Sequence, residues 1–252
     1  MRSAVRGIGY YSKAISILFQ YNLWTYFLVP SITSLILIFT VFKTRSKLVD
    51  PVQSFIGNLY PESWIGSNWI GGALDWLGGA VGEILVWGLL LLLMKHIVMI
   101  VASPFMSLLS ERVEQIVTGK KSGGFQFQKF ISDIIRGIRV ALRLLVRELF
   151  WSFIVFLLSF FLPPITAILL FLIQAYYGGA GNFDFTLERY YGYRASVQFV
   201  KENRSAALGN GIPYIALLMT IFGFLVALPL ATVAGTLQTL ELIHGTNQKR
   251  ID

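Results

Sequence analysis

Cysteine is absent from the chain, which excludes disulfide bonds, thiolate metal sites and cysteine nucleophiles. Charged residues are scarce: they make up 13% of the 252 residues, whereas 55% are hydrophobic. The mean hydropathy is +0.66. So little polar surface cannot coat a water-soluble globule, and the composition therefore predicts a membrane protein. No separate soluble domain is indicated, so we expect a single membrane domain over residues 1–252.

Sequence motifs for catalysis and cofactor binding are missing as well. Neither a phosphate-cradling G-x-x-x-x-G-K-[ST] loop nor a G-x-G-x-x-G sequence occurs. The two histidines, His96 and His244, lie far apart in the sequence, which does not favour a metal site. We therefore expect no enzyme, no cofactor and no metal ion. The net charge of +8 fits basic loops beside anionic lipid better than nucleic acid binding.

Residues 1–20 have the pattern of an amphipathic helix that lies flat on the membrane. One face is polar, with Arg2, Arg6, Lys13, Ser16 and Gln20, and the other is apolar, with Val5, Ile8, Ile15, Leu18 and Phe19. The apolar run that follows is longer than a signal-peptide core and lacks a small-x-small cleavage site. We therefore expect it to be retained.

Two stretches are long enough to cross a bilayer. Residues 23–42 supply about 20 residues, which at about 1.5 Å each match a hydrocarbon core of about 30 Å. A second span is predicted over residues 77–101, with its helix continuing through Pro104. Residues 43–83, between the two spans, contain tryptophans that suit an interface, and we place this segment outside the cell.

Lys95, near the end of the second predicted span, has two interpretations. If the span begins near residue 77, the Lys95 ammonium reaches the cytoplasmic interface by snorkelling. If the span begins near residue 84, Lys95 lies inside the membrane and becomes a candidate for a transport pathway. The sequence favours snorkelling.

A basic amphipathic helix is predicted over residues 128–148. Its four arginines recur at spacings of three and four, so that they share one helical face: Arg136, Arg139, Arg143 and Arg147. Such a row either contacts lipid head groups or forms a rim that collects anions. Lipid contact is the favoured interpretation, and the rim is the alternative.

Two apolar runs are interrupted by proline. Residues 149–183 carry no charge and contain Pro163 and Pro164, and residues 205–240 contain Pro229. The arms around Pro163 and Pro164 each reach only about 20 Å, too short to cross a bilayer alone. Proline also breaks an α-helix, because it lacks an N–H. We therefore predict two helical hairpins, over residues 149–177 and 212–243, that penetrate the membrane only halfway.

The charge of the loop between these runs supports hairpins. Residues 184–204 contain four basic residues, Arg189, Arg194, Lys201 and Arg204. If each run enters and leaves by the cytoplasmic face, this loop and both chain termini stay in the cytoplasm, as the positive-inside rule requires. Broken backbone at membrane depth also favours an oligomer or a water-filled pathway. Two proline-kinked spanning helices are the alternative.

Several segments together are similar to one known family. Residues 99–119, which include Ser103-Pro104-Phe105 and a following acidic helix, residues 183–189 and 199–204, and residues 228–235 resemble the CysZ family of bacterial sulfate permeases. The resemblance implies an all-α inner-membrane protein with two long spanning helices and two half-penetrating hairpins. It also implies a dimer or higher oligomer that admits sulfate for cysteine biosynthesis.

The chain departs from the family at one motif. The resemblance implies a sulfate site just before the first span, where the family carries arginine and this chain reads Asn22-Leu23-Trp24-Thr25. Backbone N–H groups, with the Asn22 and Thr25 side chains, would still bind a dianion, although weakly without arginine. The competing interpretation is that Asn22 caps a helix and Trp24 anchors it at the interface.

The sequence thus predicts a CysZ-like permease or channel for sulfate or a related small oxyanion that feeds sulfur assimilation. The alternative is a non-transporting membrane scaffold that kept the fold and lost the anion motif. For either function we expect the lipid bilayer and further copies of the chain as partners.

Overall fold

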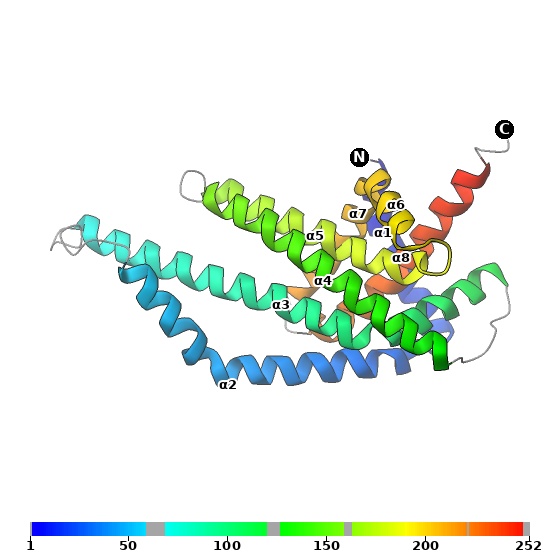
Figure 1. Ribbon diagram of the computed structural model, residues 1–252, viewed down its shortest axis with the longest axis horizontal. Helices are drawn as coiled ribbons and strands as arrows, with labels where there is room; N and C mark the ends of the chain where they lie inside the picture. The colour runs from blue at the N-terminus through cyan, green and yellow to red at the C-terminus, as the bar shows by residue number, and fades with distance from the viewer. Residues whose placement is uncertain (1, 59–68, 120–126, 159–162, 221, 249–252) are drawn as a thin grey trace. The chain divides into compact units, whose positions relative to one another are not determined.

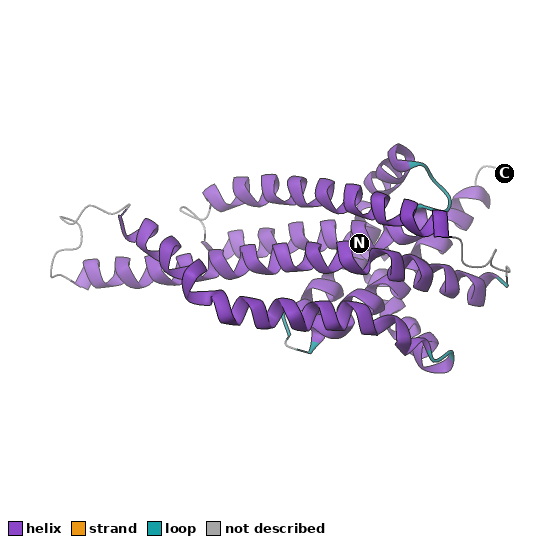
Figure 2. Ribbon diagram, turned by 60° about the horizontal axis from the view of Figure 1, so that its bottom comes forward, coloured by secondary structure: helices purple, strands orange, loops and turns teal. Residues whose placement is uncertain are grey.

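The computed structural model describes residues 2–58, 69–119, 127–158, 163–220 and 222–248. Within these residues every regular element is a helix, as the sequence predicts, and no strand occurs (Figures 1 and 2). In chain order the elements are α1 (Arg2–Gln20), η1 (Leu23–Phe27), α2 (Leu28–Asn58), α3 (Trp69–Thr118), α4 (Phe127–Leu158), α5 (Pro163–Leu187), α6 (Tyr193–Glu202), α7 (Arg204–Leu218) and α8 (Gly223–Gln248).

The chain divides into two compact units. The smaller unit covers residues 35–95, and the larger one combines residues 1–34 with residues 96–252. The larger unit contains the buried core and all the polar clusters described below. In its core, Phe183 and Leu187 of α5 pack with Ala207 of α7 and Ile243 of α8.

Three helical segments in the described residues are long and apolar enough to cross a membrane: Leu23–Thr44, Leu92–Thr118 and Gly223–Gly245. The protein is therefore an all-α membrane protein. The first segment covers the predicted span 23–42. The second lies in α3, which continues through Pro104, and the third lies in α8.

Helix α1 is buried along one face, which includes Leu18 of the predicted apolar face, whereas Ile15 and Phe19 of that face are exposed. Tyr10, Tyr11, Ala14 and Leu18 are buried, and the helix packs on α7 and α8. The Tyr11 hydroxyl donates a 2.6 Å hydrogen bond to the Asn210 carbonyl oxygen of α7. The buried hydroxyl of Tyr11 thus has a partner from elsewhere in the chain, as a buried tyrosine usually does.

The first proline-interrupted run folds as a hairpin. Helix α4 ends at Leu158, and α5 begins at Pro163 and returns alongside α4 in the opposite direction (Figure 1). Proline suits the first turn of a helix, because the N–H that it lacks has no helical partner there. Pro163 and Pro164 therefore begin the second arm of this hairpin.

In the second run, the prediction that Pro229 breaks the helix is wrong. Pro229 lies inside α8, which begins at Gly223 after α7 has ended at Leu218. A proline inside a helix leaves the carbonyl four residues earlier without its N–H partner. That carbonyl belongs to Leu225, and the Ser31 hydroxyl of α2 donates a 2.8 Å hydrogen bond to it. The helix therefore continues, because its free acceptor is satisfied from another element.

Pro104 in α3 is accommodated in the same way. Its missing N–H leaves the carbonyl of Ile100 free, and the Ser103 hydroxyl donates a 2.9 Å hydrogen bond to this oxygen. Here the donor is the residue directly before the proline. The serine and the proline together keep α3 unbroken at this point.

Helices α5 and α7 cross at two glycines. A Cβ atom added at Gly179 would lie 1.9 Å from the carbonyl oxygen of Ala207, and one added at Gly211 would lie 1.7 Å from that of Ala175. On each helix a glycine therefore allows the backbone of the other helix to approach closely. This close approach fixes α7 against the first hairpin and positions the cavity described next.

Candidate anion-binding site

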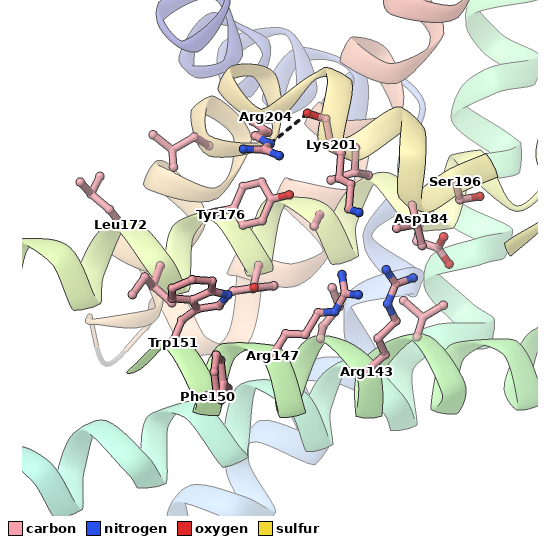
Figure 3. Close-up of a pocket in the computed structure, with 18 of the residues that line it drawn as sticks. Arg143, Arg147, Phe150, Trp151, Leu172, Tyr176, Asp184, Ser196, Lys201 and Arg204 are labelled. Atoms are coloured by element: carbon pink, nitrogen blue, oxygen red, sulfur yellow. Dashed lines mark hydrogen bonds between the residues drawn. The ribbon is translucent and has the colours of Figure 1, made fainter. Parts of the chain in front are cut away.

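A cavity of about 880 Å³ lies between the α4–α5 hairpin and helices α6 and α7. Four basic side chains from three helices line it: Arg143 and Arg147 of α4, Lys201 of α6 and Arg204 of α7. Figure 3 shows Arg143 and Arg147 extending toward Lys201 across the same space. Arg143, Arg147 and Lys201 thus bring positive charge to one part of the cavity wall, and Arg204 lies beside Tyr176.

Asp184 is the one acidic residue among those that line this cavity in the described chain, and it is already paired. The Arg136 guanidinium donates hydrogen bonds of 3.2 Å and 3.4 Å to its two carboxylate oxygens. Arg136 also donates to the Tyr191 carbonyl at 3.2 Å and to the Ser196 hydroxyl at 3.0 Å. Burial raises the pKa of the Asp184 carboxyl, and Arg136 partly offsets this rise. The carboxylate is therefore hydrogen-bonded to Arg136, and it also interacts electrostatically with Arg143.

Two contacts hold the basic groups in place. The Arg143 guanidinium lies over the ring of Tyr193, 5.1 Å from its centroid, which is a favourable cation–π arrangement. Arg204 Nε donates a 3.1 Å hydrogen bond to the carbonyl oxygen of Lys201. These contacts leave N–H groups of both arginines available to an anion.

The rest of the cavity wall is apolar and aromatic. Tyr176 and Tyr177 of α5 come next to the basic end, followed along α5 by Leu172 and Leu169, and α4 contributes Trp151. The cavity is therefore amphipathic rather than uniformly polar.

A second polar cluster is buried where α3, α5 and α8 meet. The hydroxyls of Ser110, Thr186 and Thr236 form a triangle of mutual hydrogen bonds, with oxygen–oxygen distances of 2.9, 3.2 and 2.9 Å. All three side chains are completely buried. We call these three residues the hydroxyl cluster.

The Arg189 guanidinium adjoins the hydroxyl cluster. It donates at 2.8 Å to the Ser110 hydroxyl, at 2.8 Å to a Glu114 carboxylate oxygen and at 2.7 Å to the Phe185 carbonyl. The Tyr190 hydroxyl donates at 2.5 Å to the other Glu114 oxygen. Burial and this hydrogen bond raise the pKa of Tyr190 to about 12. The charge of Arg189 is thus balanced by Glu114 beside a set of hydroxyl donors.

A buried pair of ionisable side chains joins α3 to α4. His96 Nε2 lies 3.6 Å from a Glu148 carboxylate oxygen, and the two side chains are 3% and 0% exposed. No group of three or more histidine, aspartate or glutamate residues that could hold a metal ion occurs in the described part of the chain.

The structure divides the predicted arginine row. Arg143 and Arg147 line the cavity, and Arg136 serves as the partner of Asp184. Arg139 is exposed and is not among the lining residues. Lys95 is also absent from the cavity: it is the last residue of the smaller unit, and its side chain is 1% exposed.

The family motif position forms a separate local structure. Asn22 has a left-handed backbone and makes no side-chain capping hydrogen bond, Leu23 is buried, and Thr25 is exposed. The Trp24 ring packs between the rings of Phe19 and Phe27, at centroid distances of 4.8 Å and 5.1 Å. The contacts of Trp24 are thus aromatic.

Sequence reasoning missed Lys201 and Arg204 as site residues. Both were noticed only as positive charge in a cytoplasmic loop. Their distance from Arg143 and Arg147 depends on the return of the chain through α5 and on the glycine crossing with α7. No local sequence pattern predicts how the chain returns through α5 and crosses α7.

These features define an all-helical membrane protein with polar clusters buried among its apolar helices. Residues 10–234 match the family described as sulfate transporter CysZ/etoposide-induced protein 2.4. The chain belongs to this family, which confirms the resemblance noted in the sequence. No curated protein matches the chain.

Proposed function

We propose that the protein is a permease or channel that admits sulfate or a related small oxyanion across the bacterial inner membrane and so supplies sulfur assimilation. The observation that carries the proposal is the buried hydroxyl cluster beside Arg189, in a chain of a sulfate transporter family. The protein acts without covalent catalysis and without a cofactor.

The hydroxyl cluster suits a dianion that has left water. Ser110 and Thr236 belong to the candidate spans Leu92–Thr118 and Gly223–Gly245, where polar side chains commonly line ion pathways. Each hydroxyl can turn its hydrogen toward a sulfate oxygen, and Arg189 adds a positive charge. Glu114 weakens that charge, which prevents the ion from binding too tightly to leave.

The membrane potential sets the direction of the driving force. Moving a dianion into a cell with a negative interior costs about 4.6 kcal/mol of electrical free energy per 100 mV, because each charge costs about 2.3 kcal/mol. Uptake by a passive route therefore requires an inward concentration gradient, which rapid consumption of the ion inside the cell would maintain.

The proposal includes the arrangement in the membrane. Both termini and the loop of residues 184–204 face the cytoplasm, and the hairpins enter from that side. The antiparallel packing of α4 and α5 supports this arrangement. Copies of the chain assemble into a homo-oligomer that shields the helix ends in the bilayer.

Uptake of radiolabelled sulfate into vesicles that contain the purified protein tests the proposal. Thr236→Val removes one hydroxyl of the cluster and should reduce uptake by about tenfold, the effect of losing one hydrogen bond to a charged group. Thr232→Val is the matched control: Thr232 lies one turn earlier in α8, is equally buried, and donates to the Leu228 carbonyl.

Equal uptake by the two variants would show that the ion does not pass the hydroxyl cluster. A wild-type protein that folds and gives no sulfate flux would indicate the non-transporting scaffold instead. Thiosulfate, sulfite and phosphate as competitors identify which oxyanion is preferred.

A further inference from the structure

The residues along the basic cavity change in character in one direction. On α4, successive turns carry Arg143, Arg147 and then Trp151. On α5, which runs antiparallel to α4, Asp184 lies at the same end as the arginines, while Leu172 and Leu169 lie further along. The α5 arm of the hairpin thus passes from a charged through aromatic to aliphatic side chains, and on the α4 arm the arginines are followed by Phe150 and Trp151. One leaflet of a bilayer has the same order, from head group through interface to acyl chain.

The dimensions of the cavity fit a lipid molecule better than a small ion. A volume of about 880 Å³ lies in the upper part of the range for pockets that hold sizeable organic ligands. The apolar wall from Tyr177 to Leu169 extends for about 12 Å at about 1.5 Å per residue. Half of a hydrocarbon core is about 15 Å thick. An acyl chain can therefore lie along α5 while its head group remains at the basic end.

The charge of the cavity favours an anionic head group. Arg143, Arg147 and Lys201 extend into its basic end, and the nearby carboxylate of Asp184 is held by Arg136. Guanidinium groups bind phosphate oxygens through charge-assisted hydrogen bonds. A free sulfate ion would gain the same bonds, but it would leave the wall of Trp151, Leu172 and Leu169 uncovered.

We propose that this cavity binds one anionic phospholipid, with its phosphate between Arg143, Arg147 and Lys201 and an acyl chain along α5 toward Leu169. The bound lipid connects the α4–α5 hairpin to α6 and α7. This proposal is independent of the transport pathway through the hydroxyl cluster, because the two sites share no residue.

Trp151, which lines the cavity and is 49% exposed, provides a spectroscopic probe at the cavity wall. The purified full-length protein is placed in phosphatidylcholine vesicles that contain increasing fractions of brominated phosphatidylglycerol, whose bromine atoms quench nearby tryptophan. The contribution of Trp151 is obtained as the difference between the wild type and Trp151→Phe. We expect this contribution to be quenched at low fractions of brominated phosphatidylglycerol, and not by brominated phosphatidylcholine at the same fractions.

The basic residues are tested with a charge-matched pair of variants. Arg143→Gln with Lys201→Gln should raise the fraction needed for half-maximal quenching by about thirtyfold, which corresponds to about 1 kcal/mol per charge. Arg139→Gln with Arg194→Gln removes the same charge from the same two helices, at exposed positions that do not line the cavity. This control should quench like the wild type.

Three results would overturn the proposal. One is equal quenching by the two brominated lipids, and another is an equal loss in the two double variants. The third is recovery of Trp151 fluorescence in the wild type on adding millimolar sulfate or inorganic phosphate, which would assign the basic end to a free oxyanion. The wild-type measurements decide the matter even if the double variant does not fold, and sulfate uptake by the wild type reports separately on transport.

Discussion

The Ser31 hydroxyl donates a 2.8 Å hydrogen bond to the carbonyl oxygen of Leu225, the acceptor that Pro229 leaves free in α8. Ser31→Ala should therefore destabilise the protein by about 1 kcal/mol, because a part-buried carbonyl loses its partner. Pro229→Ala restores the helical N–H, so Ser31→Ala should have little effect in that background. Reversible unfolding in mixed micelles, compared for the wild type, the two single variants and the double variant, measures this coupling. Equal effects of Ser31→Ala in both backgrounds would refute the account.

The glycine crossing predicts a steep effect of one methyl group. Gly179→Ala and Gly211→Ala each force a Cβ atom to within 2 Å of a backbone carbonyl oxygen. Overpacking of this kind costs about 1–3 kcal/mol or more, because backbone must move to relieve it. A Cβ atom at Gly192 meets nothing within 4 Å, so Gly192→Ala is the control. The midpoint of thermal aggregation in detergent should fall for the first two variants and stay constant for the third.

The contact between Tyr190 and Glu114 predicts an unusual titration. The pKa of Tyr190 is raised to about 12 from 10.0, so the folded protein holds this proton more tightly than the unfolded chain does. The resulting stabilisation is fully present below pH 10 and is lost as the pH rises through about 12. The difference in phenolate absorbance between the wild type and Tyr190→Phe measures the titration. In Glu114→Gln this titration should shift to lower pH, and an unchanged value would show that Glu114 has no part in it.

The proposed cytoplasmic placement of α6 predicts that this helix can be labelled from one side of the membrane only. Ala195 is exposed, and the native chain contains no cysteine that would react in its place. A thiol reagent that cannot cross membranes should label Ala195→Cys in inverted vesicles and not in intact spheroplasts. Labelling from the periplasm alone would support two kinked spanning helices in place of cytoplasmic hairpins.

The altered family motif predicts a gain of function. Thr25 is exposed, whereas Trp24 is packed between two aromatic rings, so Thr25→Arg adds a charge without disturbing those contacts. If an anion binds here, one charge-assisted hydrogen bond should increase sulfate affinity by about tenfold or more. Calorimetry compares the wild type, Thr25→Arg and the charge-neutral control Thr25→Gln. No gain in the folded arginine variant would place the anion site elsewhere.

Hydropathy and periodicity predicted several elements correctly because both are local properties of the chain. An apolar run long enough for the bilayer is sufficient to indicate a spanning helix, and Leu23–Thr44 is an example. The shared face of Arg143 and Arg147 also follows from helical spacing alone. The break predicted at Pro163 and Pro164 followed from the chemistry of proline, and a new helix begins at Pro163.

Where the structure departs from the sequence prediction, a distant partner decides the outcome. Pro229 does not end its helix, because Ser31 satisfies the free carbonyl from another element. The sequence made no prediction for Tyr11, which α1 buries because Asn210 supplies an acceptor for its hydroxyl. A local pattern contains no information about which distant atom will satisfy a given donor or acceptor.

The sequence by itself determined that this is an all-helical membrane protein of the sulfate transporter family, because the length of apolar runs and the family motifs are local properties of the sequence. Only the tertiary structure decided which polar groups meet. Lys201 and Arg204 line the same cavity as Arg143 and Arg147, and α5 and α7 cross beside it at two glycines. Ser110, Thr186 and Thr236 meet because three helices converge. These contacts depend on packing between segments far apart in the chain. A local stretch of sequence does not predict such packing.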